Sequence, residues 1–83
     1  MVDVTIYTKD VCPYCIKAKH LLKRKGVEFK EINLTSKPDE YEKLKNTTNF
    51  YTVPQIFIGK EFIGGCDDLY ELEKKGQLDE ILK

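Results

Sequence analysis

The strongest restriction on the fold of this chain is a pair of cysteines, Cys12 and Cys15, placed where a strand-like run meets a helix-like run. Residues 2–7 alternate apolar and polar side chains, which is the period of a strand with one buried face. Pro13 suits the first turn of a helix, where its missing N–H would have no intrahelical partner. Two cysteines with this spacing at a strand-to-helix junction are typical of a redox-active dithiol.

The surroundings of Cys12 predict that it is the reactive thiol of the pair. It is expected just outside the helix N-terminus, among unpaired N–H donors and at the positive end of the helix dipole. Lys9, three residues upstream, adds a second positive field. Such surroundings favour the thiolate, which is the attacking species in thiol–disulfide exchange. We therefore expect Cys12 to be exposed and acidic, and Cys15 to be a buried, ordinary thiol.

Composition narrows the class of protein. The 83 residues predict a single domain, residues 1–83, with one modest core. Fourteen basic and fourteen acidic side chains balance to zero net charge, which argues against a nucleic-acid partner. No apolar run is as long as a membrane span, and residues 1–4 lack the pattern of a signal peptide. We expect a cytoplasmic monomer, in a compartment where a disulfide is more often catalytic than structural.

The hydrophobic pattern predicts the element order β-α-β-α-β-β-α. The first two strands, joined by a helix, should be parallel, and the last two should form a hairpin turning at 59–60. This order indicates an α/β fold with a mixed four-stranded sheet and helices on both faces. In the first half of the chain we expect a strand at 2–7, a helix at 13–25, a strand at 27–34, and a helix that is capped by Ser36 and ends at 47–49. In the second half we expect a strand at 53–58, a strand that follows the turn at 59–60 and ends at 63, and a helix from 66 or 67 to 75. Residues 77–82 form at most two helical turns.

A zinc site is the structural alternative for the two cysteines. The remaining candidate ligands are Cys66 and His20, and they do not form a second closely spaced pair. His20 lies on a helix that would have to turn it back toward its own start. No metal site is therefore predicted, and His20 is expected to be a partly exposed helix residue.

Three segments resemble the signatures of dithiol glutaredoxins, and the small bacterial members are the most similar group. The resemblance covers essentially the whole chain and implies a thioredoxin-like fold. It also implies an enzyme that reduces protein disulfides and glutathione mixed disulfides, with glutathione as co-substrate and no tightly bound cofactor. The segments are Thr8-Lys9-Asp10-Val11-Cys12-Pro13-Tyr14-Cys15, Thr52-Val53-Pro54-Gln55-Ile56-Phe57-Ile58 and Gly64-Gly65-Cys66-Asp67-Asp68-Leu69.

The resemblance implies a role for each matching residue. Cys12 is the nucleophile that forms the mixed disulfide with glutathione, and Cys15 is the resolving cysteine. Tyr14 places its ring against the bound tripeptide, and Lys9 contacts its glycine-end carboxylate. The other residues that would bind glutathione are Thr52, Val53, Pro54, Gly65, Cys66 and Asp67.

Pro54 interrupts an apolar run and donates no hydrogen bond. A trans proline at the start of a strand is the ordinary interpretation, but the resemblance implies a cis Val53–Pro54 bond. The backbone N–H and C=O of Val53 would then pair with the cysteine of glutathione, as an added strand does.

The third segment places two glycines before a helix N-terminus. Backbone N–H groups of Cys66 and Asp67 would suit the γ-glutamyl carboxylate, and the Asp67 side chain would accept from the α-ammonium group. Simple capping by acidic residues is the alternative, and both roles are compatible. Cys66 itself is expected to be a small packed residue.

The chain departs from the family pattern at 46–51, where members often have Gly followed by Arg or Gln. A second contact to the glycine-end carboxylate is therefore in question, which leaves Lys9, with Lys45 as a candidate.

Two other functions compete with the glutaredoxin interpretation. A redoxin that is reduced by a reductase, or is dedicated to ribonucleotide reductase, is disfavoured because the chain has no tryptophan, with which the thioredoxin active site begins. A module that binds an iron–sulfur cluster would commonly have Gly and Ser where this chain has Pro13 and Cys15. The expected partners are glutathione and disulfide-bonded or glutathionylated proteins, with ribonucleotide reductase as one candidate.

Overall fold

A computed structural model describes residues 2–82 and confirms the predicted order of elements, and the short helical segment that the sequence allows at 77–82 forms one helix. Every predicted helix and strand is present, so the differences from the sequence prediction concern only where elements begin and end. The elements are β1 (Val4–Thr8), α1 (Pro13–Arg24), β2 (Lys30–Asn33), α2 (Pro38–Thr48), β3 (Gln55–Ile58), β4 (Glu61–Gly64), α3 (Cys66–Lys74) and α4 (Leu78–Ile81).

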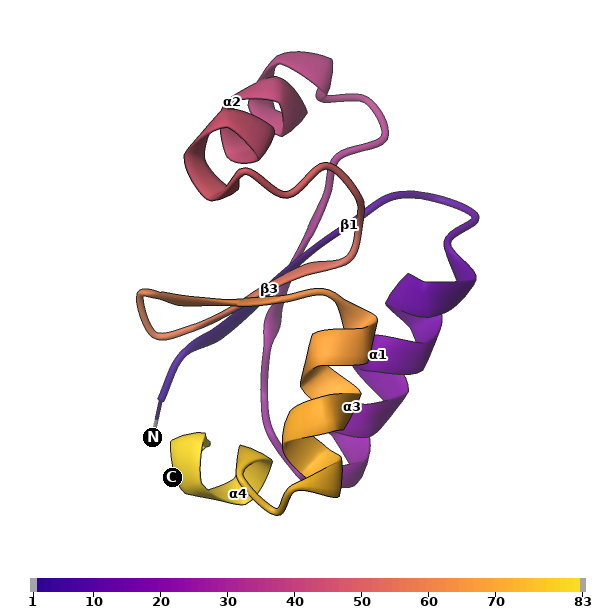
Figure 1. The fold of residues 1–83 in the computed structure, drawn as a ribbon. Helices are drawn as coiled ribbons and strands as arrows, with labels where there is room; N and C mark the ends of the chain where they lie inside the picture. Colours follow the sequence, from indigo (N-terminus) through magenta and orange to yellow (C-terminus); the bar gives the residue numbers. More distant parts are fainter. Residues whose placement is uncertain (1, 83) are drawn as a thin grey trace.

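The four strands form one mixed sheet in the order β2-β1-β3-β4. β1 is parallel to β2 and antiparallel to β3, and β3 pairs with β4 as the predicted hairpin. α1 and α3 lie side by side on one side of the sheet, and α2 lies away from them on the other side (Figure 1). The mixed sheet with helices around it is as the sequence predicts.

The hydrophobic core lies between the sheet and the pair α1 and α3. Burial of each large aliphatic side chain there contributes roughly 1.5–3 kcal/mol to stability. β1 supplies alternate residues to the core, as its period of two requires. The fully or almost fully buried members are Val4, Ile6, Ala18, Leu21, Leu22, Ile56, Leu69 and Leu78.

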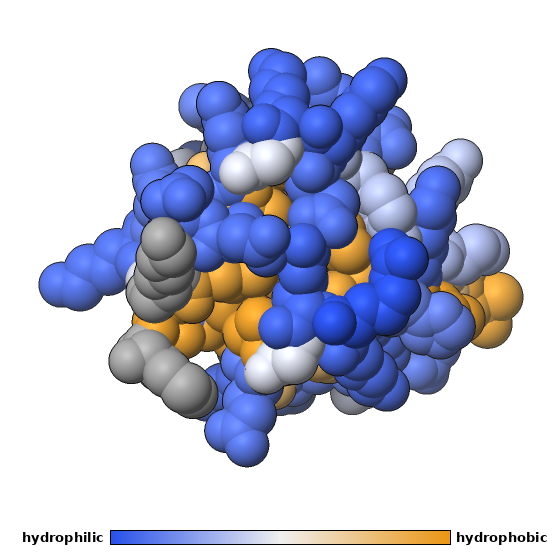
Figure 2. Space-filling view, turned by 90° about the horizontal axis from the view of Figure 1, so that it is seen from below, coloured by the Kyte–Doolittle hydropathy of each residue, from blue (hydrophilic) through white to orange (hydrophobic). Residues whose placement is uncertain are grey.

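The core reaches the surface at the end of the molecule that carries α4. Figure 2 shows this end from below, with apolar surface in the middle and hydrophilic side chains around it. A hollow between the segment that follows α1 and the C-terminal helix α4 is lined in part by Val2, Val27 and Leu82. No helix within residues 2–82 has the length and apolar character needed to span a bilayer.

α2 begins and ends differently from the prediction. Its N-cap is Lys37 rather than Ser36, because Pro38 takes the first helical position that proline favours. Its end is also sharper than weak helix propensity would make it. Asn49 adopts the left-handed conformation, with φ of 57°, and its N–H bonds the Lys45 carbonyl.

Three strands are shorter than predicted. β1 covers Val4–Thr8 rather than 2–7, because its pairing with β3 begins at Val4 opposite Ile58. β2 starts at Lys30 rather than residue 27, because its pairing with β1 begins at Thr5 opposite Lys30. Val27 and Phe29 still pack against the core. β3 starts at Gln55 rather than residue 53, because the preceding Pro54 has no N–H to give to a ladder.

Candidate active site

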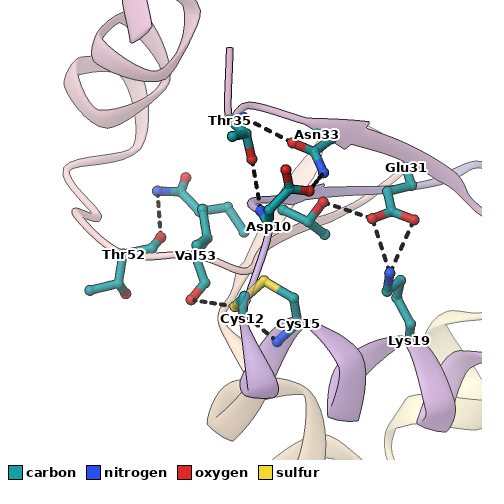
Figure 3. Close-up of a disulfide and its surroundings, with 11 residues drawn as sticks. Asp10, Cys12, Cys15, Lys19, Glu31, Asn33, Thr35, Thr52 and Val53 are labelled. Atoms are coloured by element: carbon teal, nitrogen blue, oxygen red, sulfur yellow. Dashed lines mark hydrogen bonds and ion pairs between the residues drawn. A yellow bond between two sulfur atoms is a disulfide. The ribbon is translucent and has the colours of Figure 1, made fainter. Parts of the chain in front are cut away.

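Cys12 and Cys15 are joined by a disulfide at the N-terminus of α1, as the close-up in Figure 3 shows. Cys12 is the N-cap residue, is half-buried, and accepts a hydrogen bond at its Sγ from the Cys15 N–H at 3.1 Å. Cys15 lies in the first turn and is only 2% exposed. The predicted position at the helix N-terminus is confirmed, although Cys12 is half-buried rather than exposed. An N–H donor of the first turn points at its sulfur, where it would stabilise negative charge.

The segment before β3 lies directly beside the Cys12 sulfur. The Cys12 Sγ is 3.9 Å from the Val53 carbonyl oxygen (Figure 3), and the Val53–Pro54 bond is cis, as predicted. Residues 41 positions apart in the chain therefore meet at the dithiol.

Gln55 holds this segment in place, a role that the sequence did not reveal. Its Nε2 donates to the carbonyl oxygens of Phe50 at 2.6 Å and Thr52 at 3.1 Å, while the Thr48 hydroxyl donates to its Oε1 at 2.9 Å. Gln55 is completely buried. The sequence did contain one indication of this role, an amide inside an apolar run, because a buried amide needs hydrogen-bond partners.

A second polar cluster holds the loop before Cys12, and the sequence analysis did not predict it either. The Asp10 N–H donates to the Thr35 hydroxyl at 2.7 Å, and the Asn33 side-chain amide donates to an Asp10 carboxylate oxygen at 2.8 Å (Figure 3). Between this cluster and Cys12, Val11 has φ of 54° and is 97% exposed. The left-handed conformation is unusual for a β-branched residue.

Beneath the loop, a bridge of side chains connects β1, β2 and α1. The Thr8 hydroxyl donates to Glu31 at 2.7 Å, and Lys19 forms an ion pair with the same carboxylate at 3.0 Å. The hydrogen bond from Thr8 is the main cause that lowers the pKa of Glu31, with Lys19 adding to it and partial burial opposing it. The carboxylate therefore stays ionised and fixes the middle of α1 to the sheet edge.

The third sequence segment completes a hollow next to the disulfide. Asp68 caps α3, since its carboxylate accepts the Gly65 N–H at 2.9 Å, whereas the neighbouring Asp67 is exposed and keeps its carboxylate available. A methyl group added at Gly65 would lie 3.3 Å from the Pro54 carbonyl oxygen, so only glycine allows this close approach without adjustment. The hollow is lined by Tyr14, Phe50, Thr52, Val53, Pro54, Gly65, Cys66, Asp67 and Asp68.

Cys66 is buried in the wall of this hollow. Its burial raises the pKa of the thiol, which disfavours the thiolate. The structure thus places Cys66 as the packed residue that the sequence predicts.

Lys9 lies apart from the residues that line the hollow. Its Nζ is 4.8 Å from the centre of the Tyr41 ring, and the Lys45 Nζ is 4.7 Å from the same centre. Lys45 also pairs with Glu42 at 3.0 Å. The structure therefore brings Lys9 and Lys45 to one aromatic ring, while Phe50 faces the hollow instead of a basic side chain.

His20 is exposed on α1, and within residues 2–82 no group of three or more His, Cys, Asp or Glu side chains could hold a metal ion.

Comparisons with known proteins agree on one family. The family model described as Glutaredoxin matches residues 4–63. The chain is 52% identical to a glutaredoxin of Pseudomonas aeruginosa, over 99% of this chain and 98% of that one. It is 49% identical to glutaredoxin 3 of Escherichia coli K12 over the full length of both.

Solved structures give the same result. The solution structure of a Brucella melitensis glutaredoxin is 53% identical, with a TM-score of 0.90 over 100% of this chain and 90% of that one. A buckwheat glutaredoxin in complex with glutathione is 32% identical, with a TM-score of 0.91 over 98% of this chain and 76% of that one. The predicted thioredoxin-like fold is therefore confirmed.

Proposed function

Because this chain belongs to the glutaredoxin family and is a glutathione-dependent thiol–disulfide oxidoreductase, we propose that Cys12 is its nucleophile and Cys15 its resolving thiol. One observation carries this assignment. Cys12 is partly exposed and its sulfur accepts an N–H from the first helical turn at 3.1 Å, whereas Cys15 is 2% exposed. Only the first of these sulfurs can meet a substrate from solvent.

With a glutathionylated substrate, the reaction needs one enzyme thiol. The Cys12 thiolate attacks the glutathione sulfur, an S–S bond forms between Cys12 and glutathione, and the substrate leaves as a thiolate that takes a proton from water. The thiolate of a second glutathione then attacks the glutathione sulfur of this mixed disulfide. Glutathione disulfide is released and the Cys12 thiolate is restored.

With a protein disulfide, both enzyme thiols take part. Attack by Cys12 on one substrate sulfur leaves that substrate tethered to the enzyme and frees its other sulfur. Cys15, after losing its proton, attacks Cys12 and expels the second substrate thiolate. Tethering gives this step a high effective concentration. The products are the reduced substrate and a Cys12–Cys15 disulfide, which two molecules of glutathione reduce in turn.

Glutathione, in this proposal, occupies the hollow beside Cys12. The backbone of Val53, 3.9 Å from the reactive sulfur, pairs with the cysteine of glutathione. The N–H groups of Cys66 and Asp67 take the γ-glutamyl carboxylate, and the free carboxylate of Asp67 takes the α-ammonium group. Tyr14, Thr52, Pro54 and Gly65 form the walls, while Lys9, with Lys45 beside it, takes the glycine-end carboxylate.

The proposal extends to the setting of the protein. We place a monomer with one domain, residues 1–83, in the cytoplasm, where glutathionylated and disulfide-bonded proteins are its substrates and ribonucleotide reductase is one candidate. No tightly bound cofactor takes part in the proposed reaction.

Two assays on three variants test the division of labour. Cys15→Ser should keep much of the activity on a glutathionylated peptide and lose activity on a disulfide-bonded protein, while Cys12→Ser should lose both. Gln77→Ala, at an exposed position outside the hollow, is the control and should keep both. A folded Cys15→Ser protein that is inactive on the glutathionylated peptide would show that Cys15 is more than a resolving thiol.

A further inference from the structure

The outward face of α1 carries an uneven distribution of charge, although the whole chain is neutral. The helix has no acidic residue, and Lys17, His20, Lys23 and Arg24 are all exposed on it. Their spacing of three and four residues places them on one side of the helix. Ile16, which is 51% exposed, lies on the same side next to the dithiol. We call these five residues the docking face.

The positive charge of this face is not neutralised within the protein. The other two lysines of this segment have acidic partners, since Lys19 pairs with Glu31 and Lys25 with Glu73 and Asp79. By contrast, Lys17, Lys23 and Arg24 form no ion pair with any residue of the described range 2–82. These cations are therefore available to a partner.

The face is also partly preformed. Tyr70 of α3 stands beside it, its hydroxyl donating to the Lys17 carbonyl oxygen at 3.1 Å, and the Lys17 Nζ lies 4.8 Å from the centre of the Tyr70 ring. A shallow hollow here is lined by Lys17, His20, Lys23, Arg24 and Tyr70. The basic side chains therefore surround a concave surface rather than being scattered over a convex one.

We propose that the docking face binds the protein substrate of the dithiol and favours substrates that carry acidic side chains close to the cysteine under attack. At 1.5 Å per residue, the face extends to roughly 18 Å from Cys12. An acidic segment flanking the target cysteine would reach Lys17 first and Arg24 last, with Ile16 against an apolar residue next to the sulfur. This inference rests on the proposed function and adds the chemistry by which protein substrates are selected.

A nucleic acid fits this face less well than an acidic polypeptide. Arg24 also borders a hollow in which the carboxylates of α3 outnumber its one lysine, so a continuous polyanion crossing the face would meet carboxylates. The charged residues of α3 in this hollow are Asp67, Glu71, Glu73 and Lys74. A short acidic segment can end before these carboxylates. Attraction between complementary charged surfaces raises association rates by about 10- to 1,000-fold and weakens with salt.

The test compares two cyclic disulfide peptides that differ only in a tail of glutamate or glutamine. The proteins are the native chain, the Lys17→Gln/Arg24→Gln variant, and a Lys30→Gln/Lys60→Gln control that loses the same charge from exposed positions elsewhere. The native protein and the control should reduce the acidic peptide with about tenfold higher kcat/KM at low salt. The docking variant should lose that preference, and salt near 1 M, with a Debye length of about 3 Å, should remove it from all three.

Other outcomes overturn the inference. Equal rates on the two peptides with the native protein, or an equal loss on both peptides in the docking variant, would do so. Turnover of a small glutathionylated thiol should be the same in all three proteins, and its absence in the native protein would refute the proposed function instead. Binding of the acidic peptide to a Cys12→Ser/Cys15→Ser protein tests docking without turnover. No preference for the acidic tail there, or tighter binding of a single-stranded oligothymidine, would contradict the proposal.

Discussion

The two ends of α1 carry opposite poles of the helix dipole, and different groups face each pole. At the N-terminal end, the positive pole of the helix faces the Cys12 sulfur, and polar contacts from distant loops hold the approach to it. At the C-terminal end, the negative pole is offset by cations, and Lys25 bonds Glu73 at 2.6 Å and Asp79 at 2.9 Å. One helix thus carries reactivity at one end and attachment to α3 and α4 at the other.

The two ends of α1 also differ in burial, so that residues near its C-terminal end contribute more to stability and residues near its N-terminal end more to the reaction. Leu21 and Leu22, in the second half of α1, are completely buried, whereas Val11 and Tyr14, at its start, are among the most exposed apolar residues. Substitutions of the buried residues and of Lys25 toward the C-terminal end should therefore change the free energy of unfolding more than the chemistry at Cys12. Substitutions that alter the surroundings of the Cys12 sulfur should affect the reaction more than the stability.

The largest effect is expected from Leu21→Ala, which tests the stable half of the helix. Removal of this fully buried side chain should lower the free energy of unfolding by about 2–5 kcal/mol, measured by urea denaturation. Ile16→Ala, on the exposed side of the same helix, should change it by only about 0.5 kcal/mol. Equal losses in the two variants would contradict the placement of the core beneath α1.

Gln55→Ala should affect both stability and the reaction, because Gln55 is buried like a core residue and also holds the segment beside Cys12. The change leaves the carbonyl oxygens of Phe50 and Thr52 without their donor, at a cost of about 1–3 kcal/mol. The KM for glutathione should rise as the segment beside Cys12 loosens. The exposed Gln77→Ala serves as the control, and an unchanged KM in Gln55→Ala would show that the segment holds its shape without the amide.

Lys25→Met should lower the free energy of unfolding by less than Gln55→Ala does, and it should leave the reaction at Cys12 unchanged. Hydrogen bonds to Glu73, then to Asp79, raise the pKa of Lys25 above its ordinary value. A raised folded-state pKa means that the contribution is fully present below the unfolded pKa of about 10.4 and is lost as the pH rises through the folded pKa. The difference in unfolding midpoint between the variant and the native protein should therefore be present at pH 7 and vanish in strong alkali.

Lys75→Met, which removes a more exposed ion pair with Glu71 at 3.7 Å, is the control for Lys25 and should have little effect at any pH. A Lys25→Met protein with altered kcat would break the proposed separation between the two ends of α1.

Val11→Gly should have the smallest effect on the free energy of unfolding, and it should raise this free energy where the other variants lower it. Glycine accepts the left-handed conformation that costs an L-residue roughly 1–2 kcal/mol, although its greater freedom in the unfolded chain offsets part of the gain. A net increase in the free energy of unfolding of about 0.5 kcal/mol is expected. Because Val11 is 97% exposed, a loss of stability instead would reveal contacts of its side chain that matter.

The sequence by itself determined the dithiol, the order of elements and the hairpin. The Cys12–Cys15 spacing, the alternation at 2–7 and the turn at 59–60 are local patterns, and local patterns set helix, strand and turn. Burial of Cys15 followed from its position in the first helical turn. The cis Val53–Pro54 bond was predicted only through family resemblance, since composition alone favours the trans form.

The tertiary structure alone decided how the site is held. The contacts of Asp10 with Asn33 and Thr35 join residues more than twenty positions apart, and no pattern along the chain pairs them. Likewise, only the packed structure shows that Asp68 caps α3 while Asp67 stays free, and that Lys25 has two acidic partners. The strength of hydrogen bonds and ion pairs changes with differences in distance of a few tenths of an ångström, and these distances are set only after the helices have packed on the sheet.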